Sequence, residues 1–408
     1  MSNLTGIIAA STRPSPTVVV DATALDTGHA ARGIGRYVRG LVEGLTREEI
    51  TADFDAPMVA LRLETPRAPV VAGMPGAATA LAKPLAQWHL KRPSAQHRVR
   101  WVFNEALLAG ELRAKNCALF HATEPWGVPV SARFATVLTC HDLIPLLFAD
   151  QYLNFAHYYW RAYYAWMQRT KRWSSVERII AISQATRTSL IEELGVDPSR
   201  IDIVYNGIDH GFFKPVLNPA RLATVRERYD LKRPFILYLG GYDYRKNIKA
   251  LVEAMAFVPG ARDVELVLAG GMDAQSARQF EAIAAQQPAT RLRRLGYIAD
   301  ADIPALYSMA ALFCYPSLAE GFGLQALEAM ACGCPVVSSD RTSLPEVIGD
   351  AGLLADPESP EALGHQISRV LEDPALAERL RVAGLARAAE FSWERCARET
   401  LDVYRRAL

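Results

Sequence analysis

Short apolar, β-branched runs alternate with helical patterns along the whole chain. The runs predict strands at Thr17–Asp21, Ala135–Cys140, Arg178–Ser183, Ile201–Tyr205, Phe235–Leu239, Val264–Ala269, Ala311–Tyr315 and Cys334–Ser338. Apolar positions at helical spacing predict helices at Gly35–Leu45, Asn247–Phe257, Ala274–Ala285 and Pro360–Leu371. Because strands that alternate with helices of this length form right-handed βαβ units, the pattern predicts an α/β protein with parallel sheets.

The alternating pattern restarts after the turn dipeptide Asn206-Gly207, and 408 residues are long for one hydrophobic core. We therefore expect two doubly wound, Rossmann-like domains that face each other across a cleft, formed by residues 1–207 and 208–390. In residues 391–408, Ser392 is placed to cap a last helix, Trp393–Arg406, which we expect to pack back on the N-terminal domain. Ligands of such sheets bind beyond the carboxyl ends of the strands.

Composition narrows the class of protein. Half of the residues are apolar and 22% are charged, which excludes a disordered or collagen-like chain. No apolar run approaches the ~18 residues that span a membrane, and the first residues lack the pattern of a secretory signal. The six cysteines are scattered without a Cys-x-x-Cys pair, so we expect neither a metal site nor disulfides, and a reducing cytoplasm as the location.

The net charge of +1 indicates no partner, but one region is basic. Residues 78–178 hold 13 basic and 6 acidic residues, and nine of the 22 residues in Tyr152–Trp173 are aromatic. Aromatic side chains mixed with cations suit an anionic membrane surface or an acceptor groove. The alternatives are a core helix with snorkelling basic residues and an ordinary solvated surface. A peripheral position on the inner face of the cytoplasmic membrane follows from the first interpretation.

The most informative stretch runs from Tyr315 to Val337 and predicts a strand, a glycine-rich turn, a helix and a second strand. Gly321 and Gly323 allow the backbone to approach a ligand closely. The helix that begins near Leu324 directs free N–H groups and its positive dipole end at that ligand, which suits an anion. Glu320 and Glu328 would flank the anion, and a carboxylate can accept two hydrogen bonds from a vicinal diol. This pattern describes a nucleotide-sugar site.

Two other strands end in residues with suitable chemistry. After Phe235–Leu239 come two glycines and then Arg245 and Lys246, and fixed positive charge of this kind stabilises a diphosphate. After Ala135–Cys140 comes His141-Asp142, a candidate site at a carboxyl end. Asp142 can orient the imidazole or cap a helix, and we expect the cap. Ser183 is either a site residue or an ordinary helix N-cap.

Two short patterns exclude other chemistry. In Arg32-Gly33-Ile34-Gly35-Arg36-Tyr37 the third glycine of a dinucleotide fingerprint is absent, because Val38 stands there. A nicotinamide oxidoreductase is therefore disfavoured. Two Asp-x-Asp pairs, at 53–55 and 300–302, do not resemble metal sites, and we expect an aspartate of the second pair to cap the helix that follows.

The stretch around Glu320 and Glu328 resembles the glutamate–seven-residue–glutamate motif of family 4 glycosyltransferases, which are retaining enzymes of the GT-B fold. Similar sequences continue in residues 343–357, 266–270, 295–297 and 391–404. The Gly-Ile-Gly-Arg-Tyr form at Gly33–Tyr37 resembles members that build bacterial surface polysaccharides, often mannosyltransferases that use GDP-mannose.

The resemblance implies a role for each motif residue. Glu320 would hold the transferred sugar, His141 would lie near it, and Arg245 and Lys246 would neutralise the leaving diphosphate. The donor-binding residues implied are Gly33, Gly35, Gly241, Tyr297, Ile298, Phe322, Gly323, Leu324 and Glu328. We expect no metal or other cofactor, and as partners a nucleotide-sugar donor and a glycan or lipid-linked acceptor, but no nucleic acid. A nucleotide-sugar 2-epimerase and a non-catalytic sugar-binding partner remain alternatives.

Overall fold

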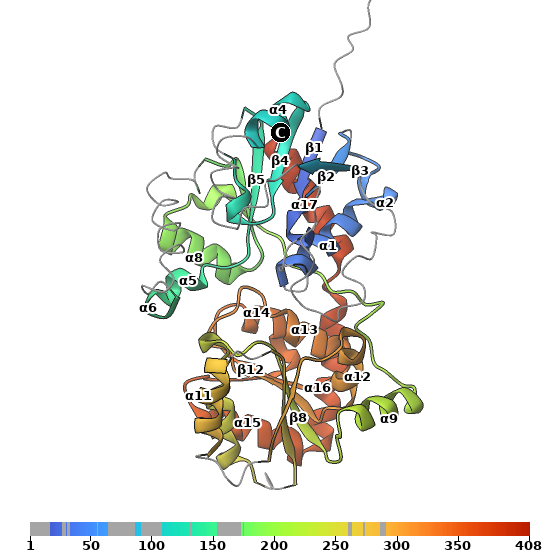
Figure 1. Ribbon diagram of the computed structural model, residues 1–408, viewed down its shortest axis with the longest axis vertical. Coiled ribbons are helices and arrows are strands. Elements are labelled where there is room, and N and C mark those ends of the chain that lie inside the picture. The colour runs from blue at the N-terminus through green and yellow to red at the C-terminus, as the bar shows by residue number, and fades with distance from the viewer. Residues whose placement is uncertain are drawn as a thin grey trace, which may run out of the picture.

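The computed structural model contains two α/β domains, one above the other in Figure 1. The residues that it describes are 17–26, 30, 33–54, 56–63, 86–90, 108–129, 133–152, 173, 175–259, 263–271, 274–285 and 291–408. Each domain is built on a parallel sheet with helices against it, as the alternating pattern predicts.

The N-terminal sheet has the strand order β3-β2-β1-β4-β5-β6-β7. Its strands are β1 Thr17–Asp21, β2 Met58–Leu63, β3 Ala86–Leu90, β4 Cys117–Ala122, β5 Ala135–Cys140, β6 Arg178–Ala181 and β7 Ile201–Ile203. The helices of this domain are α1 Gly33–Leu45, α2 Glu48–Thr51, α4 Ala109–Ala114, α5 Ile144–Leu147, α6 Ala149–Tyr152 and α8 Gln184–Leu194.

The C-terminal sheet has the order β10-β9-β8-β11-β12-β13. Its strands are β8 Phe235–Leu239, β9 Glu265–Ala269, β10 Leu292–Gly296, β11 Leu312–Tyr315, β12 Val336–Ser339 and β13 Leu353–Ala355. The helices are α9 Pro219–Arg228, α10 Ile248–Ala254, α11 Ala274–Ala285, α12 Ile303–Met309, α13 Leu324–Ala331, α14 Leu344–Ile348, α15 Pro360–Glu372 and α16 Pro374–Ala389.

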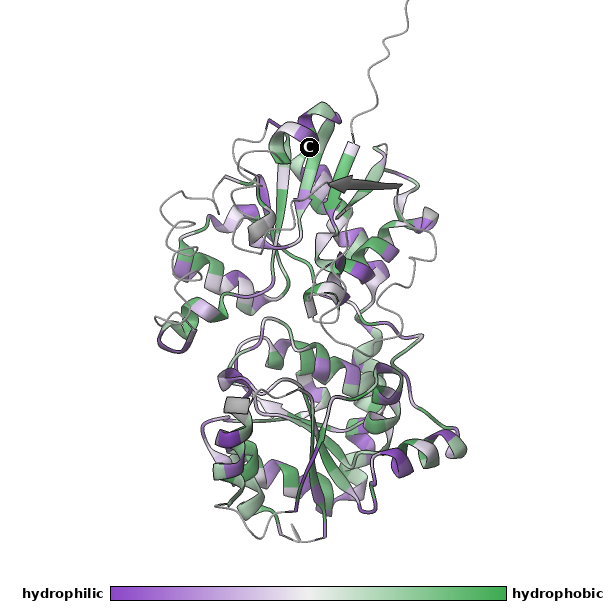
Figure 2. Cartoon of the chain, viewed as in Figure 1, coloured by the Kyte–Doolittle hydropathy of each residue, from purple (hydrophilic) through white to green (hydrophobic). Residues whose placement is uncertain are grey.

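Burial of both faces explains why the strands read as continuous apolar runs rather than as alternating ones. All five residues of β1 and all five of β8 are buried, and Figure 2 shows the apolar strands between helices with polar outer surfaces. In each sheet the direction of winding reverses, beside β1 and beside β8. Parallel sheets bind ligands beyond the carboxyl ends of the strands at such a point, and these ends carry the predicted motifs.

The last helix, α17 (Trp393–Ala407), lies against α1 of the first domain, where Figure 1 draws it in red beside blue. Ser392 caps it by accepting a hydrogen bond from the Arg395 amide at 3.1 Å, as the sequence predicts. The chain therefore passes between the domains twice. Both passages lie side by side, because Ile208 and Ser392 form an isolated parallel bridge.

Other expectations have mixed outcomes. All eight predicted strands are present, and each predicted end lies within two residues of the observed end. Five further strands, β2, β3, β4, β10 and β13, were not predicted. The helix predicted at Asn247–Phe257 is α10 followed by a 3-10 turn, Met255–Phe257. All six cysteines are buried and unpaired. Within the described ranges, no helix is both long and apolar enough to cross a membrane.

The contact between α1 and α17 predicts the effect of a single methyl group. A Cβ on Gly40 of α1 would lie 2.1 Å from Trp393 Cδ2, whereas a Cβ on Gly110 of α4 would meet nothing within 4 Å. Gly40→Ala should therefore lower the free energy of unfolding by about 1–3 kcal/mol through overpacking. Gly110→Ala, the matched helical control, should leave stability unchanged or raise it. Melting curves that coincide for the two variants would contradict this packing.

Candidate active site

Arg245 and Lys246 reach the cleft because the loop after β8 folds into a short 3-10 helix, Tyr244–Lys246. Asp243 caps this helix, and its carboxylate accepts a hydrogen bond from the Arg245 amide at 3.2 Å. Asn247, with a φ of 52°, turns the chain into α10. The two cations are thus carried at the carboxyl end of the strand at which the sheet changes direction.

Glu320 lies between these two cations. Its Oε1 accepts a hydrogen bond from Lys246 Nζ at 2.6 Å, and its Oε2 accepts one from Arg245 Nη1 at 2.7 Å. Lys246 Nζ also donates to the Tyr315 hydroxyl at 2.6 Å. Glu320 is 8% exposed and Lys246 is 5% exposed, so this ionic cluster is shielded from bulk water. The structure therefore brings together three residues that the sequence assigns to one site.

The electrostatics of the cluster favour the charged form of the carboxyl. Burial acts to raise the pKa of Glu320, but the charges of Lys246 and Arg245 outweigh burial and lower the pKa to about 2. Burial lowers the pKa of Lys246, and the Glu320 carboxylate partly opposes this. Glu320 is therefore an ionised hydrogen-bond acceptor throughout the physiological pH range.

A second loop holds Glu320 at the start of α13. The Ser343 hydroxyl donates to the carbonyl oxygens of Glu320 and Phe322, each at 2.9 Å. Gly323 has a φ of +105°, which strongly favours glycine, and α13 begins at the next residue, Leu324. Phe322 is buried, and its ring packs against that of Phe391. The loop thus presents the N-terminus of α13 beside the ionic cluster.

Glu328 lies one turn inside α13 and is 1% exposed. Its Oε1 forms an ion pair with Arg36, which comes from α1 of the other domain. Its second oxygen, Oε2, is buried without a hydrogen-bond partner among the described residues. Burial raises the pKa of Glu328, against the opposing effect of Arg36. One oxygen of this carboxylate thus joins the domains, and the other is enclosed in the interior.

His141 follows β5 and faces the same cleft. Its Nε2 donates to the Thr123 carbonyl oxygen at 2.9 Å, which fixes a proton on that nitrogen, and the edge of its ring packs against Tyr37 at a centroid distance of 4.9 Å. The backbone of His141 touches the other domain, because a Cβ on Gly321 would lie 2.0 Å from its carbonyl oxygen. The backbone of His141 therefore lies against the turn that carries Glu320.

Two polar residues near His141 have local roles. Asp142 Oδ1 accepts a hydrogen bond from the Ile144 amide at 3.1 Å in a turn just before α5, whereas the N-cap position of that helix is Leu143, so the expected capping role is met only in part. Ser183 caps α8 by accepting from the Thr186 amide at 3.0 Å. A further contact closes this part of the cleft, because Glu346 of α14 accepts hydrogen bonds from the amides of the first two residues of α8, at 2.8 and 3.0 Å.

The predicted glycines occupy three parts of the cleft. Gly33 begins α1, where a Cβ would lie 4.0 Å from Leu324 Cδ1 of the facing helix. Gly35 is buried in the first turn of α1. Gly241, after β8, borders open space. The N-termini of α1 and α13 therefore approach each other from opposite domains.

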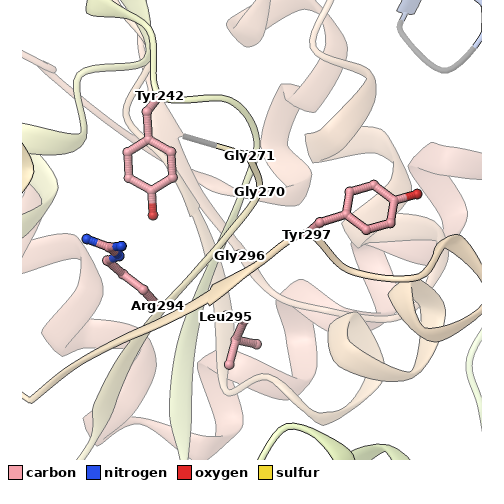
Figure 3. Close-up of a pocket in the computed structure, with 7 residues that line it drawn as sticks. All are labelled: Tyr242, Gly270, Gly271, Arg294, Leu295, Gly296 and Tyr297. Carbon is pink, nitrogen blue, oxygen red and sulfur yellow. The ribbon is translucent and has the colours of Figure 1, made fainter. Parts of the chain in front are cut away.

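Beside this cleft the C-terminal domain holds a pocket of ≈ 360 Å³, shown in Figure 3. Its lining residues are Tyr242, Gly270, Gly271, Arg294, Leu295, Gly296 and Tyr297. They come from the carboxyl ends of β8, β9 and β10. Tyr297 is the predicted donor residue in this lining, whereas Ile298 is buried beneath it. Tyr242 lies in the loop that also carries Arg245 and Lys246, so the pocket adjoins the ionic cluster.

Several residues of the site were not predicted from the sequence: no role was assigned to Tyr315, Ser343 or Arg294. Arg36 lies in the recognised motif Gly33–Tyr37, but its pairing with Glu328 was not predicted either. The expected cap at residues 300–302 is wrong: Asp302 makes no capping bond and instead accepts from Arg221 at 2.5 Å, Arg228 at 2.6 Å and Tyr229 at 2.8 Å. Three donors around one buried carboxylate outcompete a cap.

Two predictions from the sequence, the membrane-binding segment and the absence of a metal, are not tested by the structure. Between Tyr152 and Trp173, residues 153–172 lie outside the described residues, as do Lys91, Arg92 and Arg98. In the part of the chain that is described, no three His, Cys, Asp or Glu side chains are grouped to hold a metal ion. Membrane binding and metal independence therefore both stay predictions.

Comparisons with known proteins agree with this geometry. Residues 31–212 match the model of "Glycosyltransferase Family 4", and residues 224–387 match that of "Glycosyl transferases group 1". O-antigen chain mannosyltransferase B of Escherichia coli is 36% identical over 234 residues, which are 57% of this chain and 61% of that protein. The chain thus spans less than two thirds of that relative's length.

A second relative is covered more fully. Alpha-maltose-1-phosphate synthase of Mycolicibacterium smegmatis is 31% identical over 333 residues, which are 72% of this chain and 85% of that protein. Among solved structures, sucrose-phosphate synthase from Thermosynechococcus elongatus superposes with a TM-score of 0.71 at 26% identity, covering 96% of this chain and 98% of that one. The two facing Rossmann-like domains are the GT-B architecture, and the chain belongs to glycosyltransferase family 4, with mannosyltransferases of bacterial O-antigen synthesis among its relatives.

Proposed function

We propose that the chain transfers mannose from GDP-mannose, with retention, to a hydroxyl of a glycan or lipid-linked acceptor in the synthesis of a cell-surface polysaccharide. One observation carries the proposal: Glu320 is held between Arg245 and Lys246 at the start of α13, opposite His141. The mannosyl group is favoured by the O-antigen mannosyltransferase among the relatives.

In this proposal the diphosphate of the donor lies against Arg245, Lys246 and the N-terminus of α13. Both cations donate to Glu320 in the structure, so a bound diphosphate would share their remaining N–H groups. Glu320, ionised because of its low pKa, would accept hydrogen bonds from hydroxyls of the transferred sugar. Glu328, one turn further along α13, would bind the ribose.

The reaction that fits this arrangement is a same-face displacement. The bond from the anomeric carbon to the diphosphate oxygen breaks, the acceptor oxygen bonds to that carbon from the same face, and the acceptor's proton passes to the departing diphosphate. No carboxylate of the cluster need act as a nucleophile, since Glu320 is already engaged by two cations. The protein would act by positioning the reactants and by stabilising the leaving charge.

The test of the proposal begins with the donor. GDP-, UDP- and dTDP-sugars are screened by thermal shift, and the best is then incubated with octyl α-D-mannoside as the acceptor probe. A glycoside product with the donor's anomeric configuration, seen by NMR, supports the proposal. A changed nucleotide sugar formed without acceptor would instead indicate an epimerase, and donor binding without turnover would indicate a sugar-binding protein.

Lys246→Ala should reduce turnover by about a hundred- to thousandfold, because loss of one donor to developing charge costs ~2.7–4 kcal/mol. Lys249→Ala is the matched control: Lys249 lies three residues further along the chain, its side chain is 65% exposed, and its removal should leave turnover unchanged. Steady-state rates on folded variants decide the matter. Turnover of the Lys246 variant within about threefold of wild type would overturn the assignment.

Transfer should continue in excess EDTA. The charge that a divalent cation supplies to a diphosphate elsewhere would come here from Arg245, Lys246 and the α13 N-terminus. Rates are measured after chelation and after return of manganese. Complete loss of activity that manganese restores would contradict the expected metal independence.

An anionic membrane surface is the last element of the proposal. Reversal of Arg169, Lys171 and Arg172 to Glu should weaken binding to anionic vesicles by more than about tenfold, since each basic residue near such a surface contributes ~1 kcal/mol. Donor hydrolysis should be retained. Reversal of three exposed cations elsewhere, Lys232, Arg233 and Arg379, is the control. Wild-type protein that never sediments with anionic vesicles at low salt would exclude this surface.

A further inference from the structure

The pocket at the carboxyl ends of β8, β9 and β10 is lined by three glycines and four larger residues. A Cβ on Gly271 or on Gly296 would meet nothing within 4 Å, so these two glycines leave the pocket unobstructed at the ends of β9 and β10. None of the seven lining residues is acidic. The sole charged side chain among them is that of Arg294, on β10.

The Arg294 guanidinium is held at the edge of this pocket. It lies 5.6 Å from the centroid of the Phe280 ring, and the Phe280 ring in turn meets the edge of Tyr242 at 5.9 Å. Figure 3 shows the side chains of Arg294 and Tyr242 pointing toward one another across the pocket. The contact of Arg294 Nη1 with Glu281 Oε1, at 3.3 Å, involves a glutamate that is 70% exposed. Surface pairs of this kind are weak, so most N–H groups of the fork remain usable by a ligand.

The position of the pocket along the cleft indicates which part of a donor it would receive. The pocket residue Tyr242 lies in the loop after β8 that also carries Arg245 and Lys246, and Glu328 lies on the helix whose N-terminus adjoins Glu320 and these cations. A nucleotide whose diphosphate contacts Arg245 and Lys246 and whose ribose contacts Glu328 would therefore place its base in the pocket.

We propose that Arg294 selects the base of the donor and that the base is guanine. This inference rests on the proposed function and deepens it. A guanidinium carries only donors, arranged in a planar fork. Guanine presents two adjacent acceptors, O6 and N7, that match this fork, whereas adenine presents an amino group in place of O6. Uracil offers a single acceptor on the corresponding edge and would leave the fork half satisfied.

The experiment is a binding cycle by calorimetry with GDP, 7-deaza-GDP, ADP and UDP. 7-deaza-GDP lacks the N7 acceptor and keeps the rest of the molecule. The variants are Arg294→Met, which removes the fork and keeps an apolar stem, and Arg291→Met, an exposed arginine just before the same strand that is absent from the pocket lining. Wild type and the Arg291 control should bind GDP more tightly than the other three nucleotides.

In Arg294→Met, GDP affinity should fall about 5- to 150-fold, the range that one bidentate base contact supplies. Its preference for GDP over 7-deaza-GDP should disappear, while UDP affinity stays unchanged. An equal loss for all four nucleotides, an unchanged GDP affinity, or tighter binding of UDP or ADP by wild type would each overturn the role of Arg294.

Failure of this inference is distinguishable from failure of the proposed function. If wild type prefers UDP and transfers a sugar from a UDP-sugar in a Lys246-dependent way, glycosyl transfer stands and the guanine assignment falls. If no nucleotide binds to wild type, both fall together.

Discussion

A carboxylate removed from water must be paired, and the pairing of Glu320 with Lys246 and Arg245 is the interaction on which the cleft depends. Dehydrating three charges costs several kcal/mol for each, and only close, hydrogen-bonded contacts repay it. The contacts come from two different loops, one after β8 and one after β11, so neither loop can shift without leaving a buried charge alone. The cluster therefore fixes the geometry of both loops before any ligand arrives.

The contacts between the domains are of another kind. Among the described residues they include polar pairs, Arg36 with Glu328 and Glu346 with the first amides of α8, and ring contacts, Phe148 with Tyr244 and Tyr205 with Phe322. Mixed polar and aromatic contacts of this kind are typical of interfaces between domains of one chain. Half of the site is thus rigid within the second domain, while the contribution of the first domain depends on how the two domains are oriented.

Features that depend on residues close together in the sequence are predicted well from the sequence. The buried parallel strands read as apolar runs, the helix after Gly323 has its glycine-rich start, and Glu320, Arg245 and Lys246 follow strand ends that the topology brings together. The sequence does not predict β4, whose run includes His121, nor short β13. His121 can be buried there only because Thr139 and Tyr404, distant in sequence, both hydrogen-bond to it at 2.7 Å.

The same limit applies to partners across the cleft. Nothing local in Arg36 indicates that it meets Glu328, 292 residues later, and nothing in Arg294 indicates a pocket built from three separate loops. Asp302 shows the converse error, since a favourable local cap is replaced by three donors that tertiary structure supplies. Contacts between residues distant in the sequence depend on how the strands and helices are arranged in space. The pattern of apolar and polar residues predicts that arrangement only as a fold class.

The position of α17 has a consequence for the order in which the molecule is assembled. Cys396, Leu401 and Tyr404 belong to the same buried cluster as Tyr37, Val38 and Leu41, so the core of the first domain contains residues that are synthesised after the entire second domain. A nascent chain that has emerged as far as residue 207 has the strands of that domain but an uncovered apolar face on α1. The second domain, whose core draws on residues 208–391 apart from Ile182 and Tyr205, can complete its packing first, and the domain nearest the N-terminus becomes native last.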